Sequence, residues 1–188
     1  MDFIQEIIDR ALEVLQAEGN LLYPTDTIWG IGCDARSSKA VETIYSLKKR
    51  LDSKALICLV KDFDMLTEYV GRVDKILLPY LEDIRPTTVI YPQVQGLSQH
   101  LCAQDGSIGI RIAKDTFCQS LISALGAPLV STSANISGQA SPQNFEEIAP
   151  EILEGVDHVV PLKQKQLQVQ ASRIIRLLPS GKIAVLRP

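Results

Sequence analysis

The chain of 188 residues is 46% hydrophobic and 22% charged, a globular composition that fits one domain and excludes an intrinsically disordered protein. Its formal net charge is only −3, which excludes general attraction to polyanions. Any contact with RNA or with a nucleotide therefore requires a local cluster of basic residues.

The first predicted elements are a helix, a strand and a polar loop. Residues 3–18 place apolar side chains at helical spacing, and Gly19 supplies the stop. Leu21-Leu22-Tyr23 predicts a strand that ends at Pro24. The loop over residues 24–32 mixes hydroxyls, one acid, a tryptophan and two glycines, and it matches neither a dinucleotide fingerprint nor a phosphate-binding loop.

A second helix is predicted over residues 38–49, and its end carries a basic cluster. Lys48, Arg50 and Lys54 belong to this cluster, which leads into a predicted buried strand at 55–60. Cations in a last helical turn interact favourably with the helix dipole, which would explain the cluster structurally. Four basic residues within seven positions also form a compact patch suited to phosphate, so both interpretations stay open here.

The middle of the chain alternates helices and strands. Residues 107–112 alternate small or charged with apolar side chains, which predicts a strand with the isoleucines on a buried face and Arg111 on the opposite face. The other elements predicted here are helices at 62–70 and 74–82, a turn and strand at 85–91, a polar loop at 93–106, and a helix at 116–125 between Asp115 and Gly126.

Small polar residues fill positions 131–138, directly after a predicted turn and strand at 126–130. Five of these eight residues carry a hydroxyl or a carboxamide. Side chains this short leave backbone N–H groups open, which suits an anionic or zwitterionic ligand, and open α/β sheets bind ligands where strands end. The alternative is an ordinary loop with self-capping turns.

The C-terminal part predicts short helical pieces over 144–153, a strand at 158–161, and a hairpin of strands 171–177 and 182–186. Helices and strands alternate along most of the chain, and the late hairpin adds antiparallel pairing. We therefore expect an α/β fold in which a single-domain, twisted, mixed parallel and antiparallel sheet is flanked by helices.

Several kinds of site are disfavoured by the residue inventory. The four cysteines share no C-x-x-C spacing and the two histidines lie outside the polar motifs, so neither a zinc site, nor a disulfide framework, nor a serine or cysteine hydrolase is indicated. The chain opens in an amphipathic, acidic pattern and contains no apolar run of membrane-spanning length, so we expect a cytoplasmic protein that does not associate with membranes.

Three segments, Tyr23 to Gly32, Lys48-Lys49-Arg50 and Ser131 to Gly138, together with a closing Val185-Leu186-Arg187-Pro188, resemble the YrdC-type threonylcarbamoyl-AMP synthase family in order and spacing. The resemblance covers nearly the whole chain and implies one YrdC-like domain over residues 1–188. It implies that L-threonine, bicarbonate or CO2, and ATP give threonylcarbamoyl-adenylate and pyrophosphate for t6A modification of tRNA. It also implies Mg²⁺ bound through ATP phosphates and water, and contacts with tRNA or double-stranded RNA and with other proteins of the t6A pathway.

The resemblance also implies roles for individual residues. Lys48 and Arg50 would be catalytic, because cations near the triphosphate stabilise charge that develops as pyrophosphate leaves. The expected ATP contacts are Arg50, Lys54, Thr88, Ser133, Asn135, Ser141 and Arg187, and the expected threonine contacts are Thr27, Ser131, Arg111 and Arg173.

The chain departs from the family pattern at three arginines. Arg85 replaces a glycine that relatives commonly have, Arg173 stands at a position that contacts threonine, and Arg176 replaces an acid. These changes add positive charge near the expected pocket, which keeps a second hypothesis open: a non-catalytic RNA-binding or accessory paralogue on the same fold. A carbamoyl-adenylate module related to hydrogenase maturation proteins is a third hypothesis, although those chains are much longer.

Overall fold

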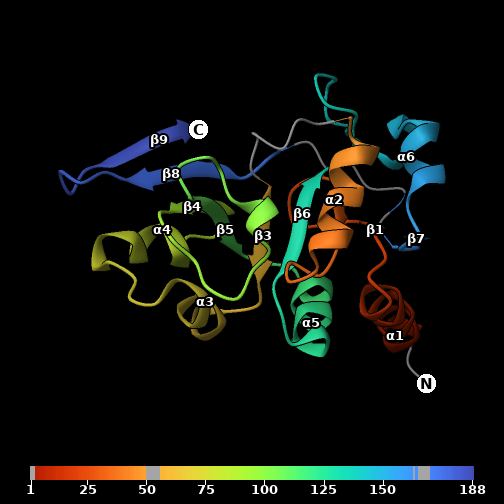
Figure 1. Ribbon diagram of the computed structural model, residues 1–188, viewed down its shortest axis with the longest axis horizontal. Helices are drawn as coiled ribbons and strands as arrows, with labels where there is room; N and C mark the ends of the chain where they lie inside the picture. The colour runs from red at the N-terminus through yellow and green to blue at the C-terminus, as the bar shows by residue number, and fades with distance from the viewer. Residues whose placement is uncertain (1–2, 50–55, 163, 165–169) are drawn as a thin grey trace.

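The computed structural model describes residues 3–49, 56–162, 164 and 170–188. Within these residues one sheet has nine strands in the order β7-β1-β2-β6-β3-β5-β4-β8-β9 (Figure 1). The strands are β1 (Leu21–Tyr23), β2 (Gly30–Gly32), β3 (Ile57–Val60), β4 (Thr87–Tyr91), β5 (Ile108–Ile112), β6 (Leu129–Ser133), β7 (His158–Val159), β8 (Arg173–Leu177) and β9 (Ile183–Arg187).

The sheet is mixed, as predicted. Pairs β1–β7, β3–β5 and β4–β8 are parallel, whereas β1–β2, β2–β6, β3–β6, β4–β5 and β8–β9 are antiparallel. The strand β6 joins the two halves, because Leu129–Ser131 pair with β3 and Thr132 and Ser133 pair with β2. Residues from both halves are therefore brought together around β6.

Helices cover the sheet (Figure 1), where α1 packs beside α5, α3 and α4 lie near β4 and β5, and α6 lies near β7. The helices are α1 (Phe3–Gln16), α2 (Ser38–Leu47), α3 (Phe63–Val70), α4 (Leu78–Glu82), α5 (Thr116–Leu125) and α6 (Pro150–Gly155), with short 3-10 turns η1 (Lys75–Leu77), η2 (Gln99–Leu101) and η3 (Phe145–Glu147). Among the described residues, no helix is both long enough and apolar enough to cross a bilayer.

The helix ends follow the capping signals in the sequence. Ser37 caps α2, since its hydroxyl accepts a hydrogen bond from the amide of Ala40 at 3.2 Å. Asp115 caps α5 by accepting a bond from the amide of Cys118 at 3.0 Å, and Gly126 ends that helix in the left-handed conformation with φ of 66°.

The sequence does not predict the strand β2, because the polar and glycine-containing composition of residues 24–32 indicates a loop. Glycine has low strand propensity, so Gly30-Ile31-Gly32 gives little strand signal. In the structure, a Cβ atom at Gly32 would lie 2.1 Å from the carbonyl oxygen of Val130 and 2.7 Å from the ring of Tyr23. The glycine is therefore required by close packing of β2 against β1 and β6.

The polar stretch after residue 130 is also placed differently from the prediction. Ser131, Thr132 and Ser133 lie within β6, so the strand ends three residues later than expected. Pairing on both sides explains the extension, because Ser131 pairs with Ile57 of β3 and Ser133 pairs with Gly30 of β2. The hydroxyls thus project from a paired strand, which fixes their direction more firmly than a loop would.

Candidate functional site

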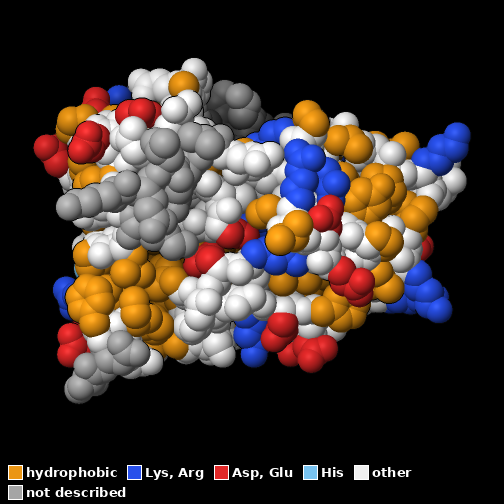
Figure 2. Space-filling model, turned by 180° about the vertical axis from the view of Figure 1, so that it is seen from behind, with side chains coloured by type: hydrophobic (Ala, Val, Ile, Leu, Met, Phe, Trp, Pro, Cys, Tyr) orange, Lys and Arg blue, Asp and Glu red, His pale blue; other side chains and the backbone are white. Residues whose placement is uncertain are grey.

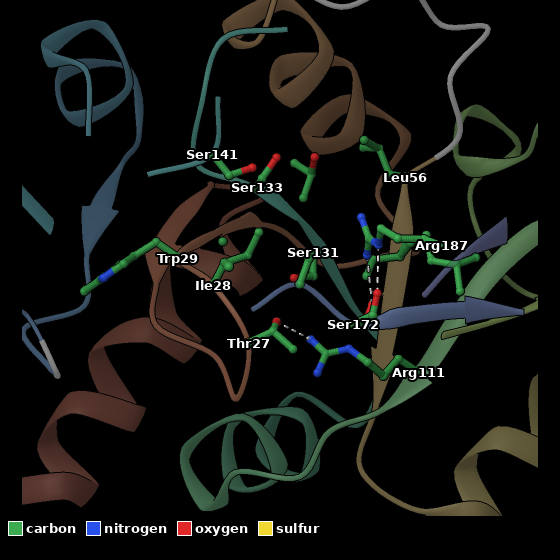
Figure 3. Close-up of a pocket in the computed structure, with 15 residues that line it drawn as sticks. Thr27, Ile28, Trp29, Leu56, Arg111, Ser131, Ser133, Ser141, Ser172 and Arg187 are labelled. Atoms are coloured by element: carbon green, nitrogen blue, oxygen red, sulfur yellow. Dashed lines mark hydrogen bonds between the residues drawn. The ribbon is translucent and has the colours of Figure 1, made fainter. Parts of the chain in front are cut away.

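A cavity of about 230 Å³ opens between β6, the loop 24–29 and the β8–β9 hairpin (Figure 3). Polar side chains from four separate parts of the chain meet there. The described residues that line it are Thr27, Ile28, Trp29, Gly30, Leu56, Ile57, Arg111, Ser131, Thr132, Ser133, Ser141, Ala171, Ser172, Ile174 and Arg187. The lining therefore includes two arginines and several hydroxyls, and none of these residues is an acid.

Arg111 and Thr27 form one wall of the cavity. Both faces of β5 are buried, so Arg111 on the face opposite Ile108 and Ile110 has a side chain that is only 1% exposed, and its charge is balanced by an ion pair with Asp26. Its second terminal nitrogen, Nη2, donates to Thr27 Oγ1 at 3.3 Å (Figure 3), and Thr27 Oγ1 lies 2.9 Å from Thr25 Oγ1. The guanidinium and the hydroxyl therefore reach the cavity as one connected unit.

Ser131, Ser133 and Ser141 supply further hydroxyls to the cavity, and Ser133 and Ser141 lie at the end farther from Arg111 (Figure 3). Ser131 lies over β2, where a Cβ atom at Gly30 would be 3.2 Å from Ser131 Oγ. A small residue at position 30 thus leaves room for the Ser131 hydroxyl. Ser141 comes from the loop after β6 and lies near Ser133.

The hairpin brings Ser172 and Arg187 to the cavity. Arg187 Nε donates to the carbonyl oxygen of Ser172 at 2.8 Å, and Arg187 Nη2 donates to Ser172 Oγ at 3.1 Å (Figure 3). Ser172 Oγ also lies 2.8 Å from Thr88 Oγ1, so Thr88, which is fully buried and does not line the cavity, contributes through Ser172.

Electrostatics favour an anionic group in this cavity. Burial, and to a smaller extent the neighbouring charge of Arg111, lower the pKa of Arg187 from its ordinary value of 12.5. Two cations that repel each other across a cavity gain when an anion lies between them. Hydroxyls beside them can donate to phosphate or carboxylate oxygens.

Lys48 and Asn135 lie behind the cavity wall. Lys48 is 1% exposed, and its ammonium donates to the carbonyl oxygens of Ser133 and, at 2.6 Å, of Asn135. Asn135 Nδ2 donates to the carbonyls of Ile136 and Gln139 at 3.0 Å and 2.7 Å. Both side chains therefore hold the turn that follows β6, and neither lines the cavity.

None of the three arginines that depart from the family pattern is among the described residues that line the cavity. Arg173 forms an ion pair with Asp83 at 3.0 Å and lies 4.9 Å from the centre of the Tyr80 ring. Arg176 forms an ion pair with Asp105 at 2.8 Å. The guanidinium of Arg173 is thus engaged by Asp83 and Tyr80, and Arg173 is not among the described residues that line the cavity.

Arg50 and Lys54 lie outside the described residues, so their predicted roles are not addressed by this structure. Two residues that sequence reasoning passed over belong to the site. In the sequence, Asp26 is simply the one acid of its loop, and no pattern singles out Ser172. Their signal was weak, because each acts through partners more than 80 positions away in the sequence.

Burial raises the pKa of all four cysteine thiols. Cys33, Cys58 and Cys118 are buried, and Cys102 is half-buried. A protonated, buried thiol is a poor nucleophile.

Comparisons with known proteins agree with this architecture. The family model for Sua5, YciO and YrdC proteins, described as "Telomere recombination", matches residues 13–188. A threonylcarbamoyl-AMP synthase from Xanthomonas euvesicatoria pv. vesicatoria is 31% identical over 158 residues, which cover 81% of this chain and 84% of that enzyme.

Solved structures show the same fold. E. coli YciO superposes with a TM-score of 0.83 at 25% identity, covering 97% of this chain and 89% of that chain. Sua5 from P. abyssi superposes with a TM-score of 0.87 at 21% identity, and it has also been crystallised with L-threonine. The match covers 98% of this chain but 56% of that Sua5 chain, so the present chain spans little more than half its length. With the family model matching nearly the whole sequence, the chain belongs to the Sua5, YciO and YrdC family.

Proposed function

We propose that this protein is a threonylcarbamoyl-AMP synthase, a nucleotidyltransferase that uses L-threonine, bicarbonate or CO2, and ATP. The observation that carries the proposal is the cavity in which Arg111 and Arg187 converge with the hydroxyls of Thr27, Ser131 and Ser133. Two cations and several hydroxyls suit substrates that bear a carboxylate and phosphates. Family membership and the name of the Xanthomonas relative support the same activity.

The proposed reaction balances without a covalent enzyme intermediate. The threonine amine adds to CO2 and loses a proton, which gives a carbamate. A carbamate oxygen then attacks the α-phosphorus of ATP, and the bond from that phosphorus to the pyrophosphate oxygen breaks. Positioning and stabilisation of charge on the phosphates then supply the catalysis.

The residues divide between the two substrates. We assign Thr27, Ser131 and Arg111 to threonine, and Ser133, Ser141 and Arg187 to ATP. Thr88 would act through Ser172, while Lys48 and Asn135 would fix the turn that presents Ser133 and add the lysine charge behind it. Arg50 and Lys54 remain predicted phosphate ligands, and Arg173 is left out because Asp83 and Thr87 engage its guanidinium.

We propose that Mg²⁺ arrives with ATP. Asp26, the carboxylate that pairs with a lining arginine, has one oxygen on Arg111 and the other on the amide of Lys114 at 3.0 Å. Both oxygens of that carboxylate already accept hydrogen bonds from the protein, so phosphate oxygens and water would supply the metal ligands.

Delivery of the product to t6A synthesis, contacts with tRNA and a cytoplasmic location remain predictions from the sequence. Two of the three divergent arginines give the RNA-binding alternative no support, because Asp83 and Asp105 pair with Arg173 and Arg176. On the face shown in Figure 2, the described basic side chains are interspersed with acidic ones. Such a mixed surface binds polyanions less well than a continuous basic surface does.

Pyrophosphate release from ATP, Mg²⁺ and bicarbonate, with and without L-threonine, tests the proposal. The wild type should release pyrophosphate only when threonine is present. Arg187→Ala should reduce kcat/KM for ATP by about 10- to 100-fold, the effect of losing a charge-assisted contact of 1.5–3 kcal/mol. Arg176→Ala removes an arginine from the same hairpin outside the cavity and should stay near wild type. Pyrophosphate release that does not depend on threonine, or an equal reduction of kcat/KM for ATP in both variants, would contradict the proposal.

A further inference from the structure

A buried ion pair between Asp26 and Arg111 joins the loop 24–29 to β5. The proposed reaction does not use the Asp26 carboxylate. The Asp26 side chain is 9% exposed and that of Arg111 is 1% exposed. Asp26 Oδ1 accepts a hydrogen bond from Arg111 Nη1, while Oδ2 accepts one from the amide of Lys114 at 3.0 Å. Both oxygens of the carboxylate are therefore directed at the end of β5.

This contact spans elements that the sheet itself does not pair. The loop 24–29 connects β1 to β2, and β6 and β3 lie between β2 and β5 in the sheet. Without a side-chain contact, only the intervening strands would relate Thr27 to Arg111. The carboxylate of Asp26 supplies a direct connection between the loop 24–29 and the end of β5.

The connection sets the direction of the groups that face the cavity. Arg111 has five N–H donors in a rigid plane, and among the described residues its hydrogen bonds are to Asp26 and Thr27. Its Nε has no partner in that part of the chain. With so few contacts, the orientation of this buried guanidinium depends chiefly on Asp26, and the orientation of the Thr27 hydroxyl depends in turn on Arg111.

We propose that Asp26 is a positioning residue for the amino-acid subsite: it holds Arg111 and Thr27 in the arrangement that binds threonine and has little influence on ATP. This inference rests on the proposed function, which assigns Arg111 and Thr27 to threonine. Ser133, Ser141 and Arg187, which are assigned to ATP, form none of the hydrogen bonds that Asp26 makes.

The test is steady-state kinetics of Asp26→Asn, at a temperature where every variant is folded. The amide keeps the size of the carboxylate but loses its charge and one of its two acceptor oxygens, so it cannot pair with Arg111 as an ion and cannot accept from both Arg111 and Lys114. We expect KM for threonine to rise at least tenfold and KM for ATP to stay within twofold of wild type. A parallel rise of both KM values, or no change in either, would overturn the proposal.

Asp34→Asn is the matched control. The Asp34 side chain is 12% exposed and forms an ion pair with Arg36 at 2.7 Å, but neither residue lines the cavity. This variant should leave both KM values near wild type, and a tenfold rise in KM for threonine here would show that the Asp26 effect is general destabilisation. If Asp26→Asn does not fold, Asp26→Glu keeps the charge, displaces the carboxylate by one methylene, and should give the same split between the two KM values.

A second measurement separates this proposal from the proposed function. If the wild type releases no threonine-dependent pyrophosphate, the enzymatic assignment fails, but hydrogen exchange of the Arg111 side chain can still be followed by NMR. Exchange at Arg111 Nε should be at least tenfold faster in Asp26→Asn than in wild type and unchanged in Asp34→Asn. Equal exchange in Asp26→Asn and wild type would show that Asp26 does not hold the guanidinium.

Discussion

The two arginines of the cavity differ in their hydrogen-bond partners, and only one of them is paired with an acid. Arg111 is paired with a buried carboxylate, whereas the hydrogen bonds of Arg187 in the described residues run to the carbonyl and hydroxyl oxygens of Ser172. Arg187 therefore keeps its full charge for a ligand, while Arg111 supplies directed donors on a locally balanced pair. This difference is the physical basis for assigning Arg187 to phosphate and Arg111 to the amino acid.

Lys48 provides a prediction at the same scale. Replacing it by Met removes the donor to two buried carbonyls, so Lys48→Met should lower the free energy of unfolding by about 2–4 kcal/mol and also lower kcat/KM for ATP, because the turn that carries Ser133 loses its support. Denaturant unfolding and pyrophosphate release measure the two effects.

Lys49→Met is its control, since Lys49 is the exposed neighbour and the substitution is the same. It should change stability by less than about 0.5 kcal/mol. Equal effects of the two substitutions would mean that the buried contacts of Lys48 carry no particular weight.

The sequence predicts together several site residues that belong to local motifs, and their individual roles stay predictions. It predicted Thr27, Ser131, Ser133, Ser141, Arg111 and Arg187, and the structure brings all six to one cavity. The sequence does not predict that Lys48 donates to backbone carbonyls or that Arg173 pairs with Asp83. Both contacts depend on the directions of side chains that are far apart in the sequence. Asp26 and Ser172 were missed for the same reason.

At the scale of elements, β2 lines the cavity through Gly30, and its close packing against β1 and β6 depends on Gly32. Gly32→Ala should destabilise the protein by about 3 kcal/mol, because the new methyl would lie 2.1 Å from a backbone oxygen that cannot yield without moving β6. The unfolding midpoint in urea or guanidinium chloride checks the size of this effect.

Gly126→Ala is the comparison for that substitution. Its backbone has φ of 66° and nothing lies within 4 Å of the added methyl, so only the left-handed conformation is penalised, at about 1 kcal/mol. If Gly126→Ala costs as much as Gly32→Ala, close packing is not the reason for the glycine in β2.

The ion pair between Asp105 and Arg176 lies beside β8 and predicts a pH dependence. Hydrogen bonds from Ser107, followed by one from Arg176, lower the pKa of Asp105 below its ordinary value of 3.8. A lowered folded-state pKa means that this stabilisation is complete above the ordinary value and is lost as the pH falls below it. Asp105→Asn should therefore reduce the drop in Tm between about pH 5 and pH 2, and a drop equal to that of the wild type would contradict this.

Element boundaries were predictable where capping residues mark them, as at Asp115 and Gly126. The β8–β9 hairpin was also predicted, because β-branched and apolar residues flank a turn with Gly181. The strand β2 and the end of β6 were not, since glycine and serine give weak strand signals and only their pairing with each other reveals them.

At the scale of the whole molecule, the class of fold was predictable and the strand order was not. Alternating helices and strands with a late hairpin indicate a mixed sheet, but the position of β6 between β2 and β3 depends on long-range pairing. That position gathers the loop after β1, the end of β5 and the hairpin around one cavity. The site is thus a product of topology as much as of motifs.

Ligand binding should stabilise the whole molecule. Mg-ATP and L-threonine together should raise Tm, because a ligand at 100 times its Kd adds about 2.7 kcal/mol to the stability of the folded state. D-threonine places its amine or its side chain differently at the same carboxylate site and should give a smaller shift in thermal unfolding experiments. Equal shifts with the two enantiomers would show that the cavity does not recognise threonine.

The most direct test of the central claim is mass spectrometry of the reaction product made from carbon-13 bicarbonate, ATP, Mg²⁺ and L-threonine. The account predicts threonylcarbamoyl-adenylate that carries one labelled carbon and forms only when all three substrates are present. An unlabelled threonyl-adenylate, or no adenylate from folded protein, would contradict it.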